Sequence, residues 1–581
     1  MVGNAYSFNN VKQTFLSLLP VQIFSFITSS LSGIVNGLII GSYLSNLDMI
    51  ALGFASPIVQ FVSVTSMIVS AGARIVCGKY IGRGEDEKVN NAFTTAMNAL
   101  LVISVVLTLI GLFLFGPVIS NFSNIDSLDR LISYIKGISI GIIPTLIVPC
   151  LMVFLQMKNK GLYALISTLI LALTNLSLDL IYVNFFNPTI FGIGVITSIS
   201  QYITLIFIVL KFVVDKDLPR LVKGGERYYK ETIIIGFPTA LANMLYAARN
   251  SYLASYAVNT YGNDVVNAIS ILNSSCGPID AVNIGINQAA LMLTAVAIGE
   301  KDKEGLNTVV KIDIIYGGLI AAIKMVLTYA FAKQIGLAFG AEGQVITYTR
   351  DLYRAYAFTM PFNIITCALV NTYQSFGKAK FCNILYALTA FIMPIGFVYL
   401  AKGLIGVNSI WYCYFAAEIL IILTMYIYAC IKHKRLVTNL NDILILNNEL
   451  DVGEHLTITI KDIEDVTKVA EEIEKYCLSE NIEKKKAMLS GLVSEEVTAN
   501  IIEHGFTKTK KKNKAIDIFV DADKEDVIIR IKDNAVPFDP HVKLKTSDDP
   551  TVNIGIKMVA KIAKEMNYQT NFGFNVLTIN M

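Results

Sequence analysis

The chain has 581 residues, of which 54% are hydrophobic and only 16% are charged, whereas about 25% of the residues of an average soluble protein are charged. This balance is typical of a membrane protein. The formal net charge of +3 is small for this length, so there is no reason to expect nucleic acid as a partner. The eight cysteines lie mostly in apolar segments without CxxC or paired spacing, which fits neither a disulfide framework nor a zinc site.

The charged residues are distributed unevenly along the chain. Residues 1–430 consist mostly of apolar segments about 20 residues long, which is the length that spans a bilayer, whereas residues 432–581 are rich in Lys, Glu and Asp. The apolar run after Lys12 has no cleavage site of small residues, so we expect a first spanning helix and not a signal peptide. Twelve spans are predicted, with centres near residues 27, 64, 104, 144, 173, 202, 245, 282, 322, 360, 390 and 420.

Basic residues occur in every second break between these segments, and the other breaks are nearly free of Lys and Arg. Cytoplasmic loops of membrane proteins carry the excess of Lys and Arg. The sequence therefore predicts a multi-pass protein of the inner (cell) membrane, in contact with the lipid bilayer, with both termini in the cytoplasm. The six basic breaks contain Lys79, Arg83 and Lys88; Lys158 and Lys160; Lys216, Arg220, Lys223, Arg227 and Lys230; Lys301 and Lys303; Lys378 and Lys380; and Lys432, Lys434 and Arg435.

The membrane part repeats itself with an offset of 217 or 218 residues. Pro20 recurs as Pro238, Ile81-Gly82 as Ile298-Gly299, Pro144 as Pro361, and Gln156 as Gln374. A constant offset indicates duplication of a six-helix unit in one membrane orientation, with the substrate site between the two copies; the alternative is chance recurrence of Pro and Gly. We predict six-helix lobes at residues 10–218 and 219–435, a linker at 436–450 and a cytoplasmic domain at 451–581.

Short motifs distributed over residues 10–432 identify a family. They are Asn36-Gly37 with Gly41, Ile81-Gly82-Arg-Gly84-Glu-Asp86, Asn175-Leu-Ser-Leu-Asp179, Gly192-Ile-Gly194 and Gly236-Phe-Pro238. Together they resemble the multidrug and toxic compound extrusion (MATE) transporters, in the branch of the bacterial DNA-damage-inducible-type exporters. The resemblance implies twelve helices, alternating access, and export of small amphipathic, often cationic solutes in exchange for protons or sodium ions.

Asp179 is the most specific candidate for ion or substrate exchange in the membrane part. A carboxylate in the middle of an apolar helix costs about 3 kcal/mol, so it usually faces a cavity, a partner or an ion pathway. Asn175 lies one turn earlier on the same face; the alternative is that Asp179 is solvated near the extracellular helix end. The resemblance implies that this pair acts with an acidic residue of the first helix, where this chain has Asn36, so any coupling site has one carboxylate fewer.

Other charged residues fall within apolar segments. We expect them either to line a substrate path or to form internal ion pairs. They are Arg249, Asp280, Lys324, Arg354 and Glu418.

Residues 451–581 show a different pattern. Strand-like alternation occurs at 456–460, 515–520, 527–531 and 575–579, and helical spacing at 463–477, 484–504 and 553–566. The pattern predicts an α/β sandwich that is large enough to fold alone.

Three segments of this domain carry polar groups suited to binding. Glu496, Asn500 and His504 are spaced for one helix face. Asp533 begins the turn Asp533-Asn-Ala-Val-Pro537-Phe-Asp-Pro540 after a strand. Gly555 opens a helix, where free backbone N–H groups receive phosphate.

In this order the three segments resemble the ATP-binding domain that histidine kinases share with gyrase, and most closely its anti-sigma-factor serine kinase branch. The resemblance implies Mg-ATP as cofactor, Glu496 as general base, Asn500 as magnesium ligand, Asp533 as acceptor for the adenine amino group and Gly555 as phosphate-loop glycine. It also implies that Thr578 reaches the adenine through water.

The glycine pattern departs from that branch, because Ala535 and Pro537 replace glycines of its Asp-x-Gly-x-Gly box. Binding with turnover, binding without turnover and a nucleotide-free docking domain therefore remain open. A Walker-type pump is excluded, because neither Gly-Lys pair of the chain is followed by Ser or Thr.

Two functions fit these observations. The first is an ion-coupled exporter whose cytoplasmic domain binds ATP and regulates transport. The second is a membrane-tethered anti-sigma-type serine kinase or partner switch, which acts on a cytoplasmic regulatory protein and uses a MATE module that senses a ligand without transporting it; Asn36 keeps this second function open.

Overall fold

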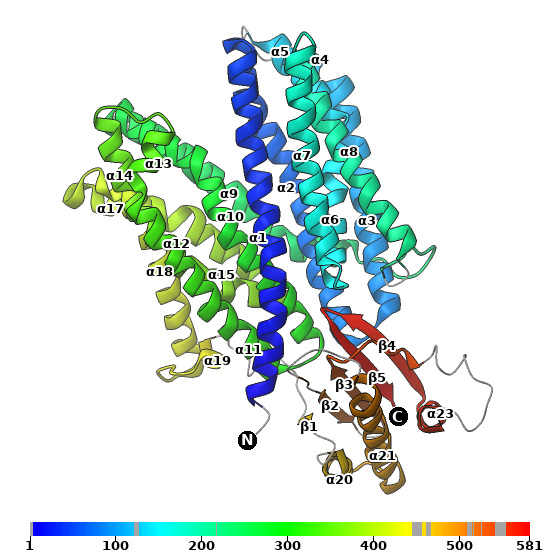
Figure 1. Ribbon diagram of the computed structural model, residues 1–581. Helices are drawn as coiled ribbons and strands as arrows, with labels where there is room; N and C mark the ends of the chain where they lie inside the picture. The colour runs from blue at the N-terminus through cyan, green and yellow to red at the C-terminus, as the bar shows by residue number, and fades with distance from the viewer. Residues whose placement is uncertain are drawn as a thin grey trace.

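The computed structural model describes residues 4–120, 127–215, 218–443, 456–460, 466–507, 514, 516–523, 526–540 and 554–581. The second half of the predicted linker, the start of the predicted domain and Asn553 lie outside the described residues. Two lobes of long helices form the membrane part, and a five-stranded sheet with its helices forms the soluble domain at one end of it (Figure 1).

The first lobe comprises helices α1 to α8. All six spans predicted for this half have their centres inside these helices. Their bounds are α1 (Asn4–Tyr43), α2 (Asn46–Arg83), α3 (Asp86–Leu109), the π-helical turn η1 (Ile110–Leu114), α4 (Phe115–Ser120), α5 (Leu128–Ser139), α6 (Ile142–Met157), α7 (Gly161–Phe185) and α8 (Ile190–Val214).

The second lobe comprises helices α9 to α18, followed by the short α19. The remaining six predicted centres lie inside them. Their bounds are α9 (Tyr229–Tyr261), α10 (Asn263–Gly299), α11 (Lys303–Ile312), η2 (Asp313–Gly317), α12 (Gly318–Ala330), α13 (Ala332–Ala338), α14 (Gln344–Ala357), α15 (Thr359–Ser375), α16 (Ala379–Ala387), η3 (Leu388–Ile392), α17 (Met393–Ile405), α18 (Asn408–His433) and α19 (Leu440–Ile443).

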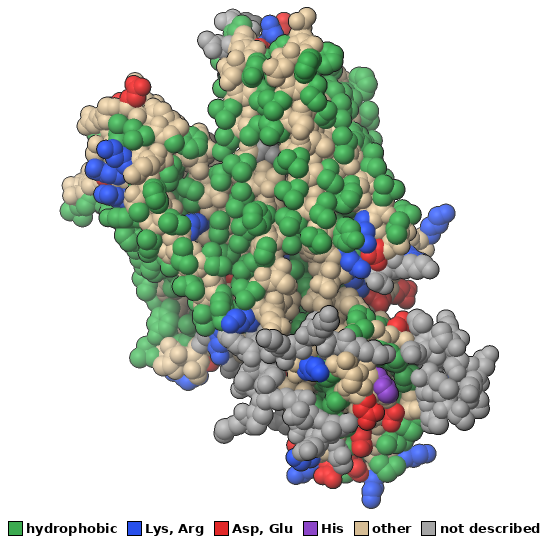
Figure 2. Space-filling view, viewed as in Figure 1, with side chains coloured by type: hydrophobic (Ala, Val, Ile, Leu, Met, Phe, Trp, Pro, Cys, Tyr) green, Lys and Arg blue, Asp and Glu red, His purple; other side chains and the backbone are tan. Residues whose placement is uncertain are grey.

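Length and composition separate these helices into two groups. Of the described helices, eight are long and apolar enough to cross a membrane, and the number is ten if the bent pairs α5–α6 (47°) and α11/α12–α13 (66°) each count as one span. The other two predicted spans, α9 and α14–α15, include the charged residues Arg249 and Arg354. Hydrophobic side chains cover most of the visible face of the membrane part (Figure 2).

The lobes meet through α1 and α2 of the first and α9 and α10 of the second. Close backbone approach explains two of the repeated glycines. A Cβ atom at Gly82 would overlap the carbonyl of Val296, and one at Gly299 would overlap the carbonyl of Lys79. We call this contact between residues 78–84, at the end of α2, and residues 295–300, at the end of α10, the seam. It lies at the end of the membrane part that adjoins the soluble domain, here called the basic end because the basic break around Arg83 lies there.

The soluble domain is a sheet of antiparallel strands in the order β1-β2-β3-β5-β4. Its helices lie on the face that points away from the membrane part (Figure 1), and its core includes Ile473, Val493, Ile529 and Ile579. The bounds are β1 (Leu456–Ile460), α20 (Val466–Ser479), α21 (Lys484–Asn500), η6 (Ile501–Gly505), β2 (Ile516–Asp523), β3 (Asp526–Asp533), α23 (Ile554–Ile562), β4 (Glu565–Asn571) and β5 (Phe574–Asn580).

The predicted helix at 553–566 is wrong in its second part. Helix α23 ends at Ile562, and residues 565–571 form β4, which pairs with β5. Met566 and Tyr568 pack against the domain core, whereas Asn567 hydrogen-bonds to the membrane part. This alternation is the period-two pattern of a strand, and the helical pattern of α23 obscured it in the sequence.

Candidate functional site

Asp179 lies on α7, fully buried, with Asn175 one turn earlier and also buried. Neither carboxylate oxygen has a hydrogen-bond partner among the described residues. Tyr134 on α5 is within electrostatic reach of Asp179. The alternative of a solvated carboxylate at the helix end is wrong, because the side chain is inaccessible.

Asn36 lies on α1, which packs against α7. Its Oδ1 atom and the Nδ2 atom of Asn175 are buried without a hydrogen-bond partner in the described part of the chain. Burying such polar atoms without partners is unfavourable. The three predicted residues thus lie on two packed helices with unused hydrogen-bonding capacity, although no hydrogen bond between described residues joins them.

Two of the charged residues of the second lobe, Lys324 and Glu418, are connected by a hydrogen-bond network. Lys324 Nζ donates to Asn283 Oδ1 at 2.7 Å and to the Ile279 carbonyl at 3.1 Å. Asn283 Nδ2 lies 3.4 Å from Asn363 Oδ1, and Asn363 Nδ2 donates to Glu418 Oε1 at 2.9 Å. Amide side chains therefore connect Lys324 to Glu418 across α12, α10, α15 and α18, in place of direct ion pairs.

Aromatic side chains hold the other charges of this lobe. Tyr356 OH lies 2.8 Å from both oxygens of Asp280, and the Arg249 guanidinium lies 4.5 Å from the centre of the Tyr414 ring. The Arg354 guanidinium lies over the Tyr329 ring, 4.9 Å from its centre. Asn283 and Asn363 were not predicted from the sequence. The signal that could have found them is an asparagine within an apolar helix, which is costly there unless it has a partner.

In the soluble domain, α21 and α23 bring three of the predicted residues together. Asn500 Nδ2 donates to the carbonyl and to Oε1 of Glu496, each at 2.8 Å. Gly555, near the start of α23, lies against the same carboxylate, since a Cβ atom there would overlap Glu496 Oε1. His504 lies in the π-helical turn η6 and is exposed.

Asp533 ends β3 and is buried. Its Oδ1 atom accepts hydrogen bonds from the Ala535 backbone N–H and from Asn575 Nδ2, each at 2.8 Å. Tyr568 OH donates to Asn575 Oδ1 at 3.0 Å and accepts from the Phe538 N–H at 2.8 Å. Burial raises the pKa of Tyr568 to about 12, so the phenol stays a donor at neutral pH. This network fixes the orientation of the Asp533 carboxylate.

The prediction for Thr578 is wrong. Thr578 pairs with Arg530 and Asn567 in the sheet and faces the membrane part. Asn575, which pairs with Asp533, lies on the opposite face. Side chains alternate along a strand, so residues three positions apart cannot share a face, and Asn575 occupies the position beside Asp533.

Comparison with known proteins identifies the membrane part. Residues 22–181 and 238–400, more than half of the chain, match the MatE family model. The chain belongs to the MatE family. Residues 460–581 match the histidine kinase-like ATPase domain, so the MatE transporter fold is followed by an ATPase-type domain, as the sequence predicted.

Curated relatives of this MatE protein include the multidrug export protein MepA of Staphylococcus saprophyticus. It is 21% identical over 296 residues, which are 50% of this chain and 65% of MepA. The probable multidrug resistance protein YoeA of Bacillus subtilis is 20% identical over 42% of this chain and 54% of its own length. Each match thus spans less than two thirds of the relative.

Solved structures show the fold. An outward-facing multidrug resistance MATE family transporter superposes with a TM-score of 0.68 at 17% identity, over 75% of this chain and 98% of that one. A transporter of the same superfamily from Pyrococcus furiosus superposes with a TM-score of 0.67 at 17% identity, over 76% and 99%. The membrane part of this MatE protein therefore has the complete transporter fold.

The ATPase-type domain of this MatE protein provides side chains that fit a magnesium nucleotide. Gly555 allows the start of α23 to approach the Glu496 carboxylate, which accepts a hydrogen bond from Asn500 Nδ2. A helix N-terminus, which favours phosphate, therefore lies beside this pair. The buried Asp533 carboxylate accepts hydrogen bonds from the Ala535 N–H and from Asn575 Nδ2, which fix its position on the same side of the sheet. Thr578 does not contribute to this set.

Proposed function

We propose that the protein is an ion-coupled exporter of small amphipathic, often cationic organic solutes in the inner membrane, with protons or sodium ions as coupling ion. The observation that supports it is the Asp179 carboxylate, fully buried and without a hydrogen-bond partner among the described residues of a MatE fold. A charged carboxylate in such a place is strongly unfavourable, and a proton or a bound cation removes that cost. Asp179 is therefore suited to exchange one bound cation for another.

Asn36 and Asn175 support the same site in a different way. Amide oxygens coordinate cations but do not titrate, so a single carboxylate carries the charge of this site. A cation held there would gain ligands from α1 and from α7 at once. Relative movement of these two helices would then change its affinity.

The C-terminal domain is proposed to bind Mg-ATP and to regulate transport. Asn500 would hold the magnesium ion, Asp533 the adenine amino group, and the N–H groups near Gly555 the phosphates. Bound Mg-ATP would supply a transferable phosphoryl group, and Glu496, beside Asn500, would accept the proton of the attacking group.

A second candidate function is a membrane-bound sensor with anti-sigma-type serine kinase activity toward a cytoplasmic regulatory protein. The observation that favours it is Asn36, because an amide replaces the carboxylate that the related exporters are expected to use. A sensor would bind solute without moving it.

Flux measurements in proteoliposomes separate the two functions. The full chain is reconstituted and efflux of a fluorescent cationic dye is followed under an imposed pH or sodium gradient, with and without Mg-ATP. We expect gradient-driven flux that Asp179→Asn abolishes, while Asp129→Asn, the same change at an exposed position of α5, leaves it intact. Dye binding without flux in the wild-type protein would exclude the exporter.

A further inference from the structure

The soluble domain uses the outer face of its sheet to contact the membrane part. This face carries Arg530 and Lys532 of β3, Asn567 of β4 and Phe574 and Val576 of β5, all of which line cavities at the basic end. The nucleotide residues lie on the other face. The docking face is therefore separate from the proposed ATP site.

Contacts to the first lobe come from β4 and the turn after it. Asn567 Nδ2 donates to the carbonyl of Gly84, which ends α2 with a positive φ of 76°. The Phe572 N–H donates to the Met157 carbonyl at the end of α6, at 3.2 Å. The Phe572 side chain is buried in the same hydrophobic cluster as residues of the membrane helices. The first lobe is thus held through α2 and α6.

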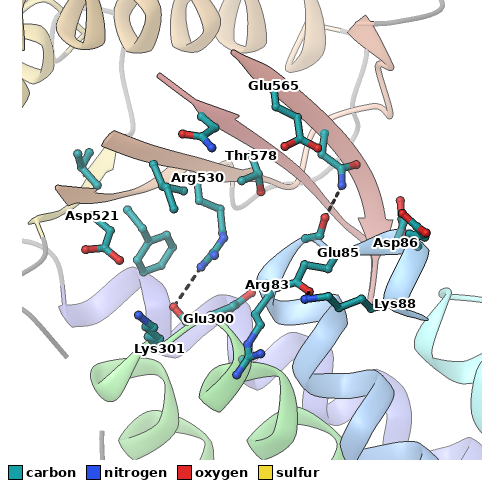
Figure 3. A pocket seen from close by; sticks show the side chains of 18 residues that line it. Arg83, Glu85, Asp86, Lys88, Glu300, Lys301, Asp521, Arg530, Glu565 and Thr578 are labelled. Carbon is teal, nitrogen blue, oxygen red and sulfur yellow. Dashed lines mark hydrogen bonds and ion pairs between the residues drawn. The ribbon is translucent and has the colours of Figure 1, made fainter. Parts of the chain in front are cut away.

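Contacts to the second lobe come from β3 and converge on one residue. Lys532 Nζ lies 3.2 Å from Glu300 Oε1. Arg530 Nη1 donates to the Glu300 carbonyl at 3.0 Å (Figure 3). The Glu300 side chain is only 6% exposed. Burial alone would lower the pKa of Lys532, but the carboxylates of Glu300 and Asp302 outweigh it and raise the pKa, so the ammonium stays charged.

The two sets of contacts lie on opposite sides of the seam. Gly84 is two residues from Gly82, and Glu300 directly follows Gly299, where α2 and α10 are in backbone contact. Strands β4, β5 and β3 are joined by continuous hydrogen bonding. A single rigid sheet therefore bridges the two lobes where they meet.

The interface between the sheet and the membrane part is not completely packed. A cavity of about 610 Å³ lies within it, lined by charged side chains that include Arg83, Lys88 and Glu565 (Figure 3). Domains move relative to each other unless the interface between them is large and hydrophobic, and this one is polar around its cavity. The structure of this interface is consistent with reversible docking.

We propose that the outer sheet face is a docking surface for the seam and that docking holds the basic end of the transporter closed. Opening at this end moves Gly84 away from Glu300. Because one sheet holds both residues, it cannot keep both contacts, so either the Asn567–Gly84 or the Lys532–Glu300 contact must break first. This inference rests on the proposed transport cycle, which requires the lobes to separate at each end in turn.

Hydrogen–deuterium exchange of the full chain in lipid nanodiscs tests this proposal. The readout is exchange of residues 78–84 and 295–300, which is measured without a solute gradient and without nucleotide. Lys532→Glu places two like charges at a buried contact and is expected to raise exchange there about tenfold. Glu300→Gln leaves the soluble domain unaltered and is expected to raise exchange in the same segments. The double variant Lys532→Glu with Glu300→Lys is expected to return exchange to the wild-type level.

Lys564→Glu is the matched control, because Lys564 pairs with Asp526 at an exposed site of the same domain. It is expected to leave exchange at the seam unchanged. If Lys532→Glu and Glu300→Gln both leave seam exchange at the wild-type level, the domain does not hold the basic end closed. Absent dye flux in the wild-type protein, together with increased seam exchange in these variants, would reject the exporter and retain the docking function.

Discussion

Replacing Asn575 by Ala removes the residue that the structure, and not the sequence, places beside Asp533. Asn575 donates to Asp533 Oδ1 at 2.8 Å and to the Ala535 carbonyl at 3.2 Å, and both Asp533 and Asn575 are buried. A hydrogen bond to a charged group contributes about 1.5–3 kcal/mol, and an unsatisfied buried partner adds to the loss. If about 2 kcal/mol of this loss falls on the acceptor for adenine, Mg-ATP binding weakens by about 30-fold.

Calorimetry on the purified full chain measures this change directly. Thr578→Ala is the control, because Thr578 lies on the docking face of the same strand. We expect Asn575→Ala to weaken Mg-ATP binding and Thr578→Ala to leave it unchanged. Weaker Mg-ATP binding in Thr578→Ala with normal binding in Asn575→Ala would refute the assignment of the two strand faces. A wild-type chain that shows no heat of Mg-ATP binding would show that the domain is a docking module only.

Two further predictions concern single side chains. Glu496→Gln retains an acceptor for Asn500, so we expect unchanged Mg-ATP binding with phosphoryl transfer reduced by about 10²–10⁴-fold. Calorimetry measures the binding and a phosphate-release assay measures the transfer. Retained phosphoryl transfer would contradict the role of Glu496 as general base. Asn36→Asp adds a titratable group on α1 and is expected to make dye flux depend more steeply on pH. A series of flux measurements in proteoliposomes at different pH values gives the slope of flux against pH. An unchanged slope would show that Asn36 lies outside the coupling site.

The sequence predicted the elements well where one strong pattern dominates. Every predicted membrane span coincides with helix, because long apolar runs have no other stable arrangement in a bilayer. The strand at 565–571 was missed because its alternation follows directly on a helix. The boundaries of the lobes, the linker and the domain stay predictions.

The site residues were predictable only where local spacing decides their position. Glu496 and Asn500, four residues apart on α21, are in contact as expected. The misplacement of Thr578 followed from strand register, which one sequence does not fix. The network from Lys324 to Glu418 joins residues far apart along the chain, and no local pattern records such a contact.

The proposed docking surface would let the ATPase-type domain regulate the transporter next to it without a long pathway. In β3, Lys532 points to Glu300 of the second lobe and the next residue, Asp533, belongs to the proposed nucleotide site. In β5, Asn575 pairs with Asp533 and lies between Phe574 and Val576 of the docking face. Because strand residues alternate between faces, a shift of β3 or β5 caused by a bound nucleotide would displace the contacts to the seam by a comparable amount. One layer of sheet therefore separates the proposed nucleotide site from the contact that joins the two lobes.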